Sequence, residues 1–580
     1  MMIMKNNSLG SLVFDIEANG LNPDKVWCIV AKDVRFGHTH KFDVNNIKQG
    51  ISLLNKTDTL IGHNILGYDL PVLEKLYNFK YKGKVIDTLV LSRLFNPVRD
   101  NGHSLESWGQ RLGTNKLDKP DFSVYSPEML TYCERDVTLN DKVYKALLRE
   151  GKGFSIDSID LEHEVAKILN QQEQHGFLFD EQAGTMLVAT LKEKMFETEE
   201  EVQKVFTPKL IKDKLVVPKF KKDGSLSRVG LTPQEYDDCV SKPFYRKKLQ
   251  TFNLGSRKQI GEYLIDFGWK PKKFTPTGQP IVDEKVLSEI TDIPQATLIA
   301  DYLLYQKRIA QVDSWLNALQ DDGRVHGQVI PNGTITGRMT HRNPNMAQVP
   351  NMGSLYGKEC RSCWIVPEGY KLLGVDASGL ELRMLAHYMK DEDYKNEILH
   401  GDIHTANQKM AGLETRDQAK TFIYALVYGA GDAKIGSIVG GNKDSGKKLK
   451  ETFFTNLPTL RSLRERVCRA ASRGYLKGID GRKIYVRSEH AALNTLLQGG
   501  GAIVMKKALA LLDYKFKLTN ITANFVGNIH DEWQIEVKDC QAAKAGFLAV
   551  EAIKEAGEHF NMFCPLDGEY KLGGNWSETH

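Results

Sequence analysis

The chain has 580 residues, of which 41% are hydrophobic and 26% are charged, with 78 Lys and Arg against 73 Asp and Glu. This length exceeds what one hydrophobic core supports, so about three to five lobes are expected. The composition is that of a soluble globular protein, with no apolar run near the roughly 18 residues of a membrane span and no secretory signal in residues 1–10. The formal net charge of +5 fits a nucleic-acid enzyme and an ordinary enzyme equally well.

Eight cysteines are scattered along the chain, and only Cys360 and Cys363 have the CxxC spacing of a metal-ligand pair. A structural zinc site needs four ligands, and no second pair lies nearby in the sequence. Reduced thiols in a cytosolic compartment are therefore preferred over a zinc site.

The first 150 residues show the alternation of an α/β domain. Residues 11–17 form an apolar run that stops at an Asn-Gly pair, which predicts a strand. The Ser-Pro-Glu sequence at 126–128 has the residue types of a helix start, with Ser as N-cap and Pro at the first helical position. The helix is expected to continue to about residue 148, and Gly-Lys-Gly at 151–153 is the expected linker to the next lobe.

The next part of the chain predicts long helices with an interruption. Residues 156–200 and 286–320 have a helical pattern and are rich in charge. Between them, at about 205–252, the periodicity fails while Lys, Pro and Gly accumulate, which predicts a loop-rich insertion.

Strand and helix signals alternate again from residue 325. Residues 370–376 predict a strand, and residues 380–389 and 418–428 predict helices, the second closed by Gly429 and Gly431. Residues 525–529 and 533–537 predict a hairpin whose turn holds His-Asp-Glu at 530–532.

Carboxylates gather in the first predicted domain. Asp15 and Glu17 lie two residues apart on a strand, so they point to the same face and repel each other unless a cation lies between them. Asp69 follows about fifty residues later, and Tyr132 and Asp136 lie one above the other on a helix. A solvated strand end is the plain alternative for Asp15 and Glu17 taken alone.

These three segments, in this order, resemble the DEDDy type of proofreading exonuclease, with D-x-E, N-x(3–5)-D and Y-x(3)-D elements. The resemblance implies that four carboxylates hold two divalent ions and that Tyr132 orients the attacking water. The implied metal ligands are Asp15, Glu17, Asp69 and Asp136.

A second set of polar residues lies in the C-terminal half. Asp376 follows a buried strand and Asp531 occupies a tight turn, and two such carboxylates brought together suit Mg²⁺. Arg416, Lys420, Tyr424 and Tyr428 recur at steps of four, which places them in one stripe about 18 Å long on a helix. Two cationic side chains followed by two phenol rings could bind a triphosphate followed by a sugar and a base. The alternative is an amphipathic helix whose basic end is exposed to solvent.

Together these segments resemble motifs A, B and C of the family A DNA polymerases. The residues of the motifs are most similar to those of the replicases of T-odd phages. The segments that carry this likeness are DASGLELRMLAH, GDIHTANQ, RDQAKTFIYALVYGAGDAKIG, NTLLQGGGA and IHDEW. The resemblance spans nearly the whole chain and implies template-directed DNA synthesis with 3′→5′ proofreading.

The resemblance also implies roles for single residues. Asp376 and Asp531 would hold two catalytic Mg²⁺ ions, with Mn²⁺ as an alternative, and Glu532 beside them is either catalytic or structural. Arg416, Lys420 and His404 would contact the triphosphate. The other implied contacts are Tyr424 at the deoxyribose, Tyr428 near the template base, Glu381 against a 2′-OH, and Gln498, His530, Arg338 and Gln348 on the primer-template.

The expected architecture is an α/β multidomain chain, with an RNase H-like exonuclease domain followed by a right-hand polymerase. The expected parts are the exonuclease at 1–152, a helical thumb at 153–324 with the insertion at about 205–252, an antiparallel-sheet palm at 325–390 and 516–580, and helical fingers at 391–515. The T-odd phage replicases carry a long thumb insertion that binds thioredoxin, and here the corresponding stretch is short and rich in lysine. Three interpretations of this stretch remain open: a solvated loop, a segment that contacts DNA directly, and a binding site for a processivity partner.

Primer-template DNA and dNTPs are the expected partners, without a membrane, in the cytoplasm, which is that of the host cell for a phage protein. A processivity factor such as thioredoxin and a helicase-primase stay open as further partners. A repair polymerase, an exonuclease with an inactive polymerase-like module, an RNA polymerase and a replisome scaffold are the rival interpretations. The exonuclease segments and Glu381 argue against an RNA polymerase, and the intact polar residues argue against an inactive module or a scaffold.

Overall fold

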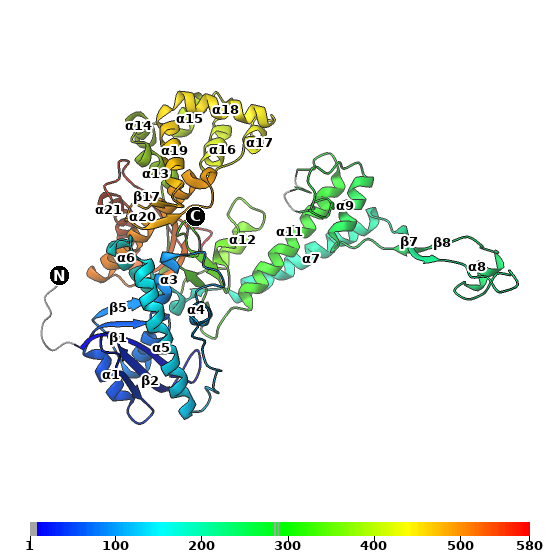
Figure 1. Cartoon of the computed structure of the whole chain (residues 1–580). Coiled ribbons are helices and arrows are strands. Elements are labelled where there is room, and N and C mark those ends of the chain that lie inside the picture. Colours follow the sequence, from blue (N-terminus) through cyan, green and yellow to red (C-terminus); the bar gives the residue numbers. More distant parts are fainter. Residues whose placement is uncertain (1–8, 284–285, 288) are drawn as a thin grey trace. The chain divides into compact units, whose positions relative to one another are not determined.

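The computed structural model describes residues 9–283, 286–287 and 289–580, and the chain forms two compact units. One unit combines Met1–Asp180 with Ala318–His580, and the other is Glu181–Asn317 (Figure 1). Every residue expected at either active site belongs to the first unit.

The first unit begins with a five-stranded sheet of order β3-β2-β1-β4-β5. The central strand β1 (Leu9–Ala18) runs antiparallel to β2 (Val26–Asp33) and parallel to β4 (Thr57–Gly62). Strands β3 (Thr39–Phe42) and β5 (Lys84–Asp87) form the edges. The apolar residues of β1 alternate between two cores, one shared with α1 (Ile47–Asn55) and α2 (Asp69–Tyr77), and the other with α5 (Pro127–Glu150).

The expected α/β domain is therefore present, with helices on both faces of the sheet. Helix α5 begins at Pro127 as expected, although Ser126 at its N-cap makes no capping hydrogen bond from its side chain. Helices α3 (Thr88–Phe95) and α4 (Leu105–Arg111) form a further small core with α5.

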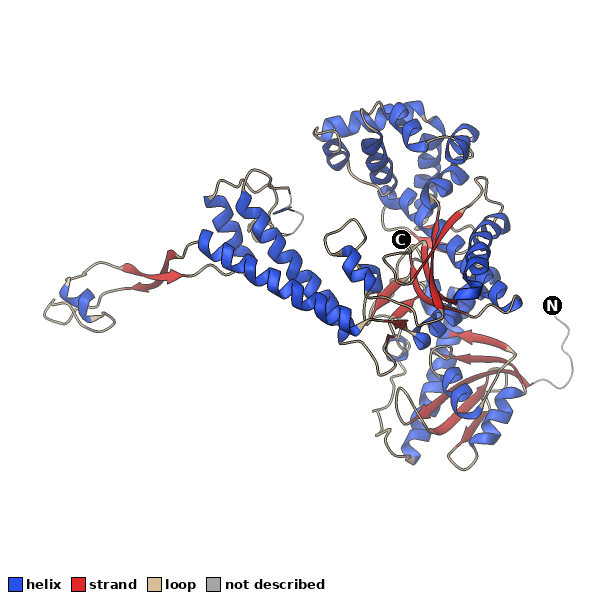
Figure 2. Ribbon diagram, turned by 180° about the vertical axis from the view of Figure 1, so that it is seen from behind, coloured by secondary structure: helices blue, strands red, loops and turns tan. Residues whose placement is uncertain are grey.

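A four-stranded antiparallel sheet of order β15-β16-β12-β17 lies at the centre of the C-terminal half (Figure 2). Its strands are β12 (Tyr370–Ala377), β15 (Ala523–Ile529), β16 (Glu532–Lys538) and β17 (Gly568–Gly573). Both the predicted strand at 370–376 and the predicted hairpin around 530–532 are confirmed. Helices α20 (Ala492–Leu518) and α21 (Ala542–His559) share the largest core with this sheet.

A helical group follows β12 in the sequence. Helix α13 (Leu380–Met389) has the predicted bounds, and α16 (Arg416–Val427) starts at a Thr415–Gln418 capping box and ends before Gly429 at φ +75°. The remaining helices are α14 (Glu392–His400), α15 (Ile403–Ala411), α17 (Asp432–Ser437), α18 (Lys443–Asn456) and α19 (Pro458–Ala471).

Short elements complete the first unit: β6 (Phe177–Leu178) with β9 (Arg324–Val325), β10 (Gln328–Ile330) with β11 (Thr340–Arg342), β13 (Tyr475–Lys477) with β14 (Lys483–Tyr485), α12 (Gly357–Ser362), and the 3-10 turns Met346–Gln348, Glu489–Ala491 and Asp539–Gln541. The stretch Glu489–Leu518 is long and apolar enough by composition to cross a membrane, but 72% of its most apolar window is buried inside the fold.

Helix α6 (Ile156–His175) packs between the two sheets of the first unit. Its fully buried Glu162 accepts hydrogen bonds from Lys506 on α20, over 2.7 Å, and from Arg482, over 2.5 Å. The next residue, His163, accepts a hydrogen bond from the backbone N–H of Asp87 over 2.9 Å. Two adjacent side chains of one helix therefore fasten the first sheet to the C-terminal core.

The second unit is built on α7 (Glu181–Val205), α9 (Arg257–Asp266) and α11 (Pro294–Leu316), around a core that contains Phe206 and Phe252. The helical pattern predicted over 156–200 is present as α6 and α7, with a break at Gly176, and in the segment predicted from 286 residues 286–287 are helical while the long helix α11 begins at Pro294. Residue 288 of that prediction lies outside the described residues.

The segment 205–252 lies between the long helices α7 and α11 and has long loops, as predicted, but the prediction missed two strands. Strands β7 (Lys209–Val216) and β8 (Phe244–Gln250) form an antiparallel ribbon, with α8 (Pro233–Asp237) between them in the sequence. Side chains of both strands are mostly exposed, so neither face needs the hydrophobic alternation by which a strand is recognised in a sequence.

Candidate functional site

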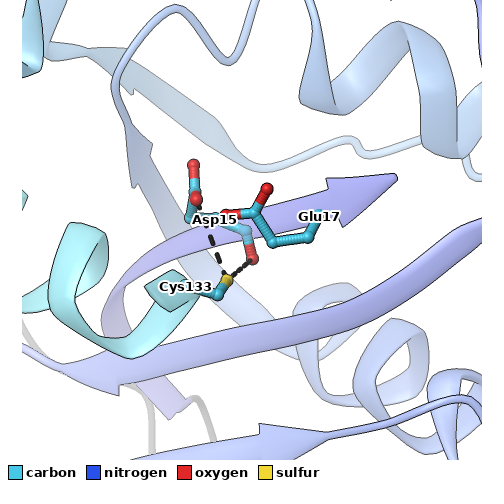
Figure 3. Close-up of side chains that lie close together, drawn as sticks. All are labelled: Asp15, Glu17 and Cys133. Carbon is cyan, nitrogen blue, oxygen red and sulfur yellow. Dashed lines mark hydrogen bonds between the residues drawn. The ribbon is translucent and has the colours of Figure 1, made fainter. Parts of the chain in front are cut away.

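Strand β1 brings two of the predicted exonuclease carboxylates together. The ligand atoms of Asp15, Glu17 and Cys133 all lie within 4.8 Å of one another, with Cys133 contributed by α5 (Figure 3). The thiol of Cys133 donates to the backbone oxygen of Asp15 over 3.4 Å and lies in the buried core below the sheet. Because hard divalent cations prefer oxygen ligands, Asp15 and Glu17 are the better ligands and Cys133 is a packing residue.

Asp69 joins this cluster from the start of α2. Its Oδ1 accepts a hydrogen bond from the backbone N–H of Ile16 over 3.1 Å, between the two carboxylates of β1. The turn that leads to Asp69 is held by buried Asp87, which accepts from the backbone N–H groups of Asn64, over 2.9 Å, and Leu66, over 3.2 Å. Asp87 was not predicted from the sequence, although its place at the end of a strand is a signal that it shares with Asp376.

Asp136 and Tyr132 lie one turn apart on α5, as predicted, and both are buried. Lys116 also lies there and was not predicted. Its Nζ is 2.5 Å from Oδ2 of Asp136 and 4.9 Å from the ring centroid of Tyr132. Lys116 belongs to an irregular loop between α4 and α5, where no periodicity indicates the direction of a side chain.

Burial raises the pKa of all four carboxylates, and repulsion from a neighbouring carboxylate adds to this for Asp15, Glu17 and Asp69. Burial, and then repulsion from Asp136, raise the pKa of Asp15 to about 7, while burial and Asp15 raise the pKa of Glu17 to about 10. Burial also raises the pKa of Asp69 and of Asp136, whose Oδ1 is buried without a hydrogen-bond partner. A buried oxygen without a partner, in a cluster of mutually repelling carboxylates, fits a binding site for divalent cations.

The predicted polymerase carboxylates also meet. Asp376 on β12 pairs in register with Glu532 on β16, and Asp531 lies in the turn just before Glu532, where its carbonyl accepts from the N–H of Ala377 over 3.2 Å. Burial, and then Asp531, raise the pKa of Asp376 to about 7. Burial, and then Glu381, raise the pKa of Asp531 to about 6. These two carboxylates form a second site suited to divalent cations.

Glu532 differs from its two neighbours because its oxygens already have partners. Oε1 accepts from Trp576, over 2.8 Å, and from Gln534, over 2.7 Å, and Oε2 lies 3.2 Å from His580. Although burial opposes it, the hydrogen bond from His580 lowers the pKa of Glu532. These contacts favour the structural alternative for Glu532 over a catalytic role.

The four-residue stripe lies on α16 and its C-cap as predicted. Arg416 forms two hydrogen bonds with Asp402, which caps α15, and the shorter one, from Nε to Oδ2, spans 2.7 Å. The rings of Tyr424 and Tyr428 stack with their centroids 6.4 Å apart. Lys420 is exposed between these two groups.

His404 on α15 faces this stripe. Its ring centroid lies 6.1 Å from that of Tyr424. Its Nδ1 is buried without a hydrogen-bond partner, and burial, followed by Arg416 and Lys420, lowers its pKa. The ring therefore has hydrogen-bonding capacity left for a ligand.

Glu381 lies between the stripe and the carboxylates. Its Oε1 accepts from Tyr428 over 3.0 Å and from Arg338 over 3.2 Å. One cavity is lined by five predicted residues together, namely Arg338, Glu381, Gln498, His530 and Asp531. Gln348 does not line it and lies exposed on the turn Met346–Gln348.

Comparisons with known proteins identify the family of this chain. The sequence profile of "DNA polymerase family A" matches residues 233–578. The chain is 35% identical to the DNA-directed DNA polymerase of Enterobacteria phage T3 and 34% identical to that of Escherichia phage T7, in both cases over 98% of this chain and 100% of the relative.

The fold is similar to a solved structure described as the POL domain of Pol1 from M. smegmatis in complex with DNA primer-template and dNTP. The TM-score is 0.78 over 98% of this chain and 95% of that chain, at 20% identity. From the profile match and the two phage relatives, this chain belongs to DNA polymerase family A.

Proposed function

We propose that this chain is a phage-type, template-directed DNA polymerase that extends a primer 3′-end with dNTPs and proofreads with a 3′→5′ exonuclease. The observation that carries the proposal is that Asp376 and Asp531 lie near each other and near Tyr424 of the Arg416–Tyr428 stripe. The full-length relatives from phages T3 and T7, which are named DNA-directed DNA polymerase, support it.

The domain bounds that we propose are the ones expected from the sequence. An RNase H-like exonuclease domain occupies 1–152, a thumb 153–324, a palm 325–390 and 516–580, and fingers 391–515. The antiparallel sheet of β12, β15, β16 and β17 is the core of the palm in this proposal, and α14 to α19 belong to the fingers.

In the polymerase site, Asp376 and Asp531 would hold divalent cations, with Mg²⁺ as the proposed ion and Mn²⁺ as the alternative. Bound cations would supply Lewis-acid activation of the primer 3′-OH and neutralise the triphosphate. Arg416, Lys420 and His404 bind the triphosphate oxygens by charge-assisted hydrogen bonds. For Arg416 this requires exchange of its Asp402 partner for phosphate.

In this proposal, the sugar and the base pair are recognised by the other residues predicted at the polymerase site. Tyr424 lies beside the deoxyribose and Tyr428 near the template base, while Glu381 fills the space of a 2′-OH. Gln498 and His530 read minor-groove acceptors that all correct base pairs share, and Arg338 and Gln348 contact the primer-template.

In the exonuclease site, Asp15, Glu17, Asp69 and Asp136 would hold divalent cations in the same way. Tyr132 orients the attacking water from its place one turn before Asp136 on α5. Lys116, which pairs with Asp136, supplies a positive charge beside the scissile phosphate.

The proposed partners are primer-template DNA and dNTPs, and the structural neighbour from M. smegmatis is described as a complex with a primer-template and a dNTP. A processivity factor such as thioredoxin and a helicase-primase are further candidates. A repair role and an exonuclease with an inactive polymerase-like module are the alternative functions.

A primer-extension assay on a long single-stranded template, with Mg²⁺, with and without thioredoxin, tests the proposal. The expected result is extension by the wild type and none by Asp531→Ala. Longer products only when thioredoxin is added would identify it as a partner. Primer degradation without any extension, in folded protein supplied with dNTPs, would instead support an exonuclease with an inactive module.

A further inference from the structure

His163 on α6 is buried and uses both of its ring nitrogens in hydrogen bonds. Its Nδ1 lies 2.7 Å from the carbonyl oxygen of Ile159, which can only accept, so Nδ1 carries the proton. Its Nε2 is therefore free to accept from the backbone N–H of Asp87, over 2.9 Å. Because burial lowers the pKa of His163, the ring stays neutral and keeps this acceptor at neutral pH.

Asp87, at the end of β5, is the residue that this hydrogen bond fixes. Both oxygens of its side chain accept from backbone N–H groups. Oδ1 accepts from Leu89 and from Asn64, each over 2.9 Å, and Oδ2 accepts from Leu66 over 3.2 Å. The bond from Leu89 caps α3, and the other two close the turn between β4 and α2. A shift of the Asp87 backbone would therefore move this turn.

The turn between β4 and α2 is not held by close packing on all sides. Asn64 has a left-handed backbone with φ +63°, which is unfavourable for a residue other than glycine. Leu66 packs with Val90 and Ala166 in a core that has only three buried residues. A cavity of about 630 Å³ is lined by Asn64, Leu66 and Asp87 together with residues of α6. The turn is therefore held mainly by hydrogen bonds, two of which go to Asp87.

This turn places Asp69 in the carboxylate cluster of β1. Asp69 is the first residue of α2, and its Oδ1 accepts from the backbone N–H of Ile16 over 3.1 Å. A continuous series of contacts thus runs from His163 through Asp87 and the turn to Asp69.

Helix α6 gives His163 a fixed position. The neighbouring residue, Glu162, is fully buried and accepts from Lys506 over 2.7 Å and from Arg482 over 2.5 Å. Both partners belong to the C-terminal half of the chain. The imidazole of His163 is therefore anchored from outside the sheet that carries the carboxylate cluster.

We infer that His163 is a positioning residue of the exonuclease site, and that it acts through Asp87 on the turn that carries Asp69. The inference rests on the proposed function, in which Asp69 is a ligand of divalent cations. Without the acceptor, the buried N–H of Asp87 has no partner, so the end of β5 and the turn shift and the cluster binds cations less tightly.

The test uses the full chain with Asp531→Ala, so that cations bind mainly at the exonuclease cluster. His163→Leu removes the acceptor, whereas His163→Gln keeps an oxygen close to the place of Nε2. His163→Asn is polar but too short to reach Asp87, and it replaces His163→Leu if that variant does not fold. The matched control is Gln172→Leu, because Gln172 is an equally buried residue of α6 that accepts from Asn528 instead.

Two cation measurements are made on each variant. The affinity for Mn²⁺ is taken from the signal of the free ion in an electron paramagnetic resonance titration. The Mg²⁺ concentration that gives half of the maximal rate is taken from degradation of a 5′-labelled single-stranded oligonucleotide.

For His163→Leu, the Mn²⁺ affinity should fall and the Mg²⁺ requirement should rise by roughly tenfold, at the lower end of the effect of losing an outer-shell partner. The rate at saturating Mg²⁺ should change less. His163→Gln should stay close to the Asp531→Ala background in both measurements. Gln172→Leu should lower the thermal midpoint about as much as His163→Leu but leave both cation measurements unchanged.

Backbone amide exchange shows where the effect acts. Amides of residues 62–70 should exchange faster in His163→Leu, while those of residues 370–377 should not change. Asp87→Asn replaces the oxygen that accepts from Leu66 and should weaken Mn²⁺ binding in the same way. Adding His163→Leu to it should have little further effect, since both changes act through one turn.

Unchanged Mn²⁺ affinity in folded His163→Leu, or in folded His163→Asn, would overturn the inference. An equal loss of affinity in Gln172→Leu or in His163→Gln would also overturn it, because the acceptor would then not be the cause. A background protein that binds Mn²⁺ but degrades no DNA would instead contradict the proposed exonuclease, and the Mn²⁺ affinities would still decide the role of His163.

Discussion

The hydroxyl of Tyr428 donates a hydrogen bond to Oε1 of Glu381 over 3.0 Å, which ties the end of α16 to the start of α13. Arg338 donates to the same oxygen over 3.2 Å. The carboxylate proposed to exclude a 2′-OH is therefore held in place from two sides, and its position depends on a residue proposed to lie near the template base.

Glu381→Ala should weaken the exclusion of ribonucleotides because a methyl group leaves room for a 2′-OH. We expect the ratio of rNTP to dNTP incorporation efficiency to rise at least tenfold. Tyr428→Phe removes one of the two hydrogen bonds that hold Glu381 and should raise the ratio by less. The double variant should match Glu381→Ala, since the two changes act through one carboxylate. An unchanged ratio in Glu381→Ala, with dNTP activity kept, would contradict the steric role.

Tyr424→Phe should increase discrimination against dideoxynucleotides. In the proposed complex the Tyr424 hydroxyl can replace the missing 3′-OH of a dideoxynucleotide as donor to a phosphate oxygen. A hydrogen bond to a charged acceptor contributes roughly 1.5–3 kcal/mol, which corresponds to at least about tenfold in discrimination.

The ratio of ddNTP to dNTP incorporation is best measured in an exonuclease-inactive background, so that terminators are not removed. Ala425→Ser, one residue further along the same helix, is a control outside the stripe. Strong rejection of dideoxynucleotides by the wild type, or an equal ratio in Tyr424→Phe, would mean that the sugar contact is misassigned.

Asp376→Asn should stabilise the cation-free protein at alkaline pH. The folded pKa of Asp376, about 7, lies above its ordinary value of 3.8 because burial and Asp531 disfavour the charged form. The stability that the neutral carboxyl provides is fully present below pH 3.8 and is lost as the pH rises through 7. Asn keeps the neutral form at every pH.

In EDTA, the thermal midpoint of Asp376→Asn should exceed that of the wild type by at least about 2 °C at pH 8, and the gap should narrow toward pH 5. Mg²⁺ at pH 8 should stabilise the wild type more than the variant. Asp321→Asn, in an exposed turn, is the control. A difference in thermal midpoint that does not depend on pH would show that ionisation of Asp376 does not destabilise the fold.

The parts of the fold that pack against a core could be predicted from the sequence. The helix at 380–389 and the strand at 370–376 are mostly apolar segments because most of their residues are buried, including four consecutive residues of the strand. The strands β7 and β8 are mostly exposed on both faces, so their sequences have no such pattern. The break at Gly176 depends on pairing with Arg324–Val325, which is far away in the sequence.

Site residues could be predicted where a short motif carries the chemistry. Asp15 and Glu17 share one strand face, and the stripe from Arg416 to Tyr428 shares one helix face. Lys116 could not be found in this way because only a tertiary contact brings it to the cluster, whereas Asp87 has the signal of a strand end but no motif that marks it as part of the site. The partners that hold Glu532, among them Trp576, likewise come from a distant segment.

The central claim is that one chain carries two separate active sites, and one measurement tests it most directly. A 5′-labelled primer on a template is incubated with Mg²⁺, with and without dNTPs, using the wild type, the double variant Asp15→Ala with Glu17→Ala, and Asp531→Ala. The double variant should extend the primer and not degrade it, and Asp531→Ala should degrade it and not extend it. Loss of both activities from either variant, in protein whose thermal midpoint shows that it is folded, would contradict the claim.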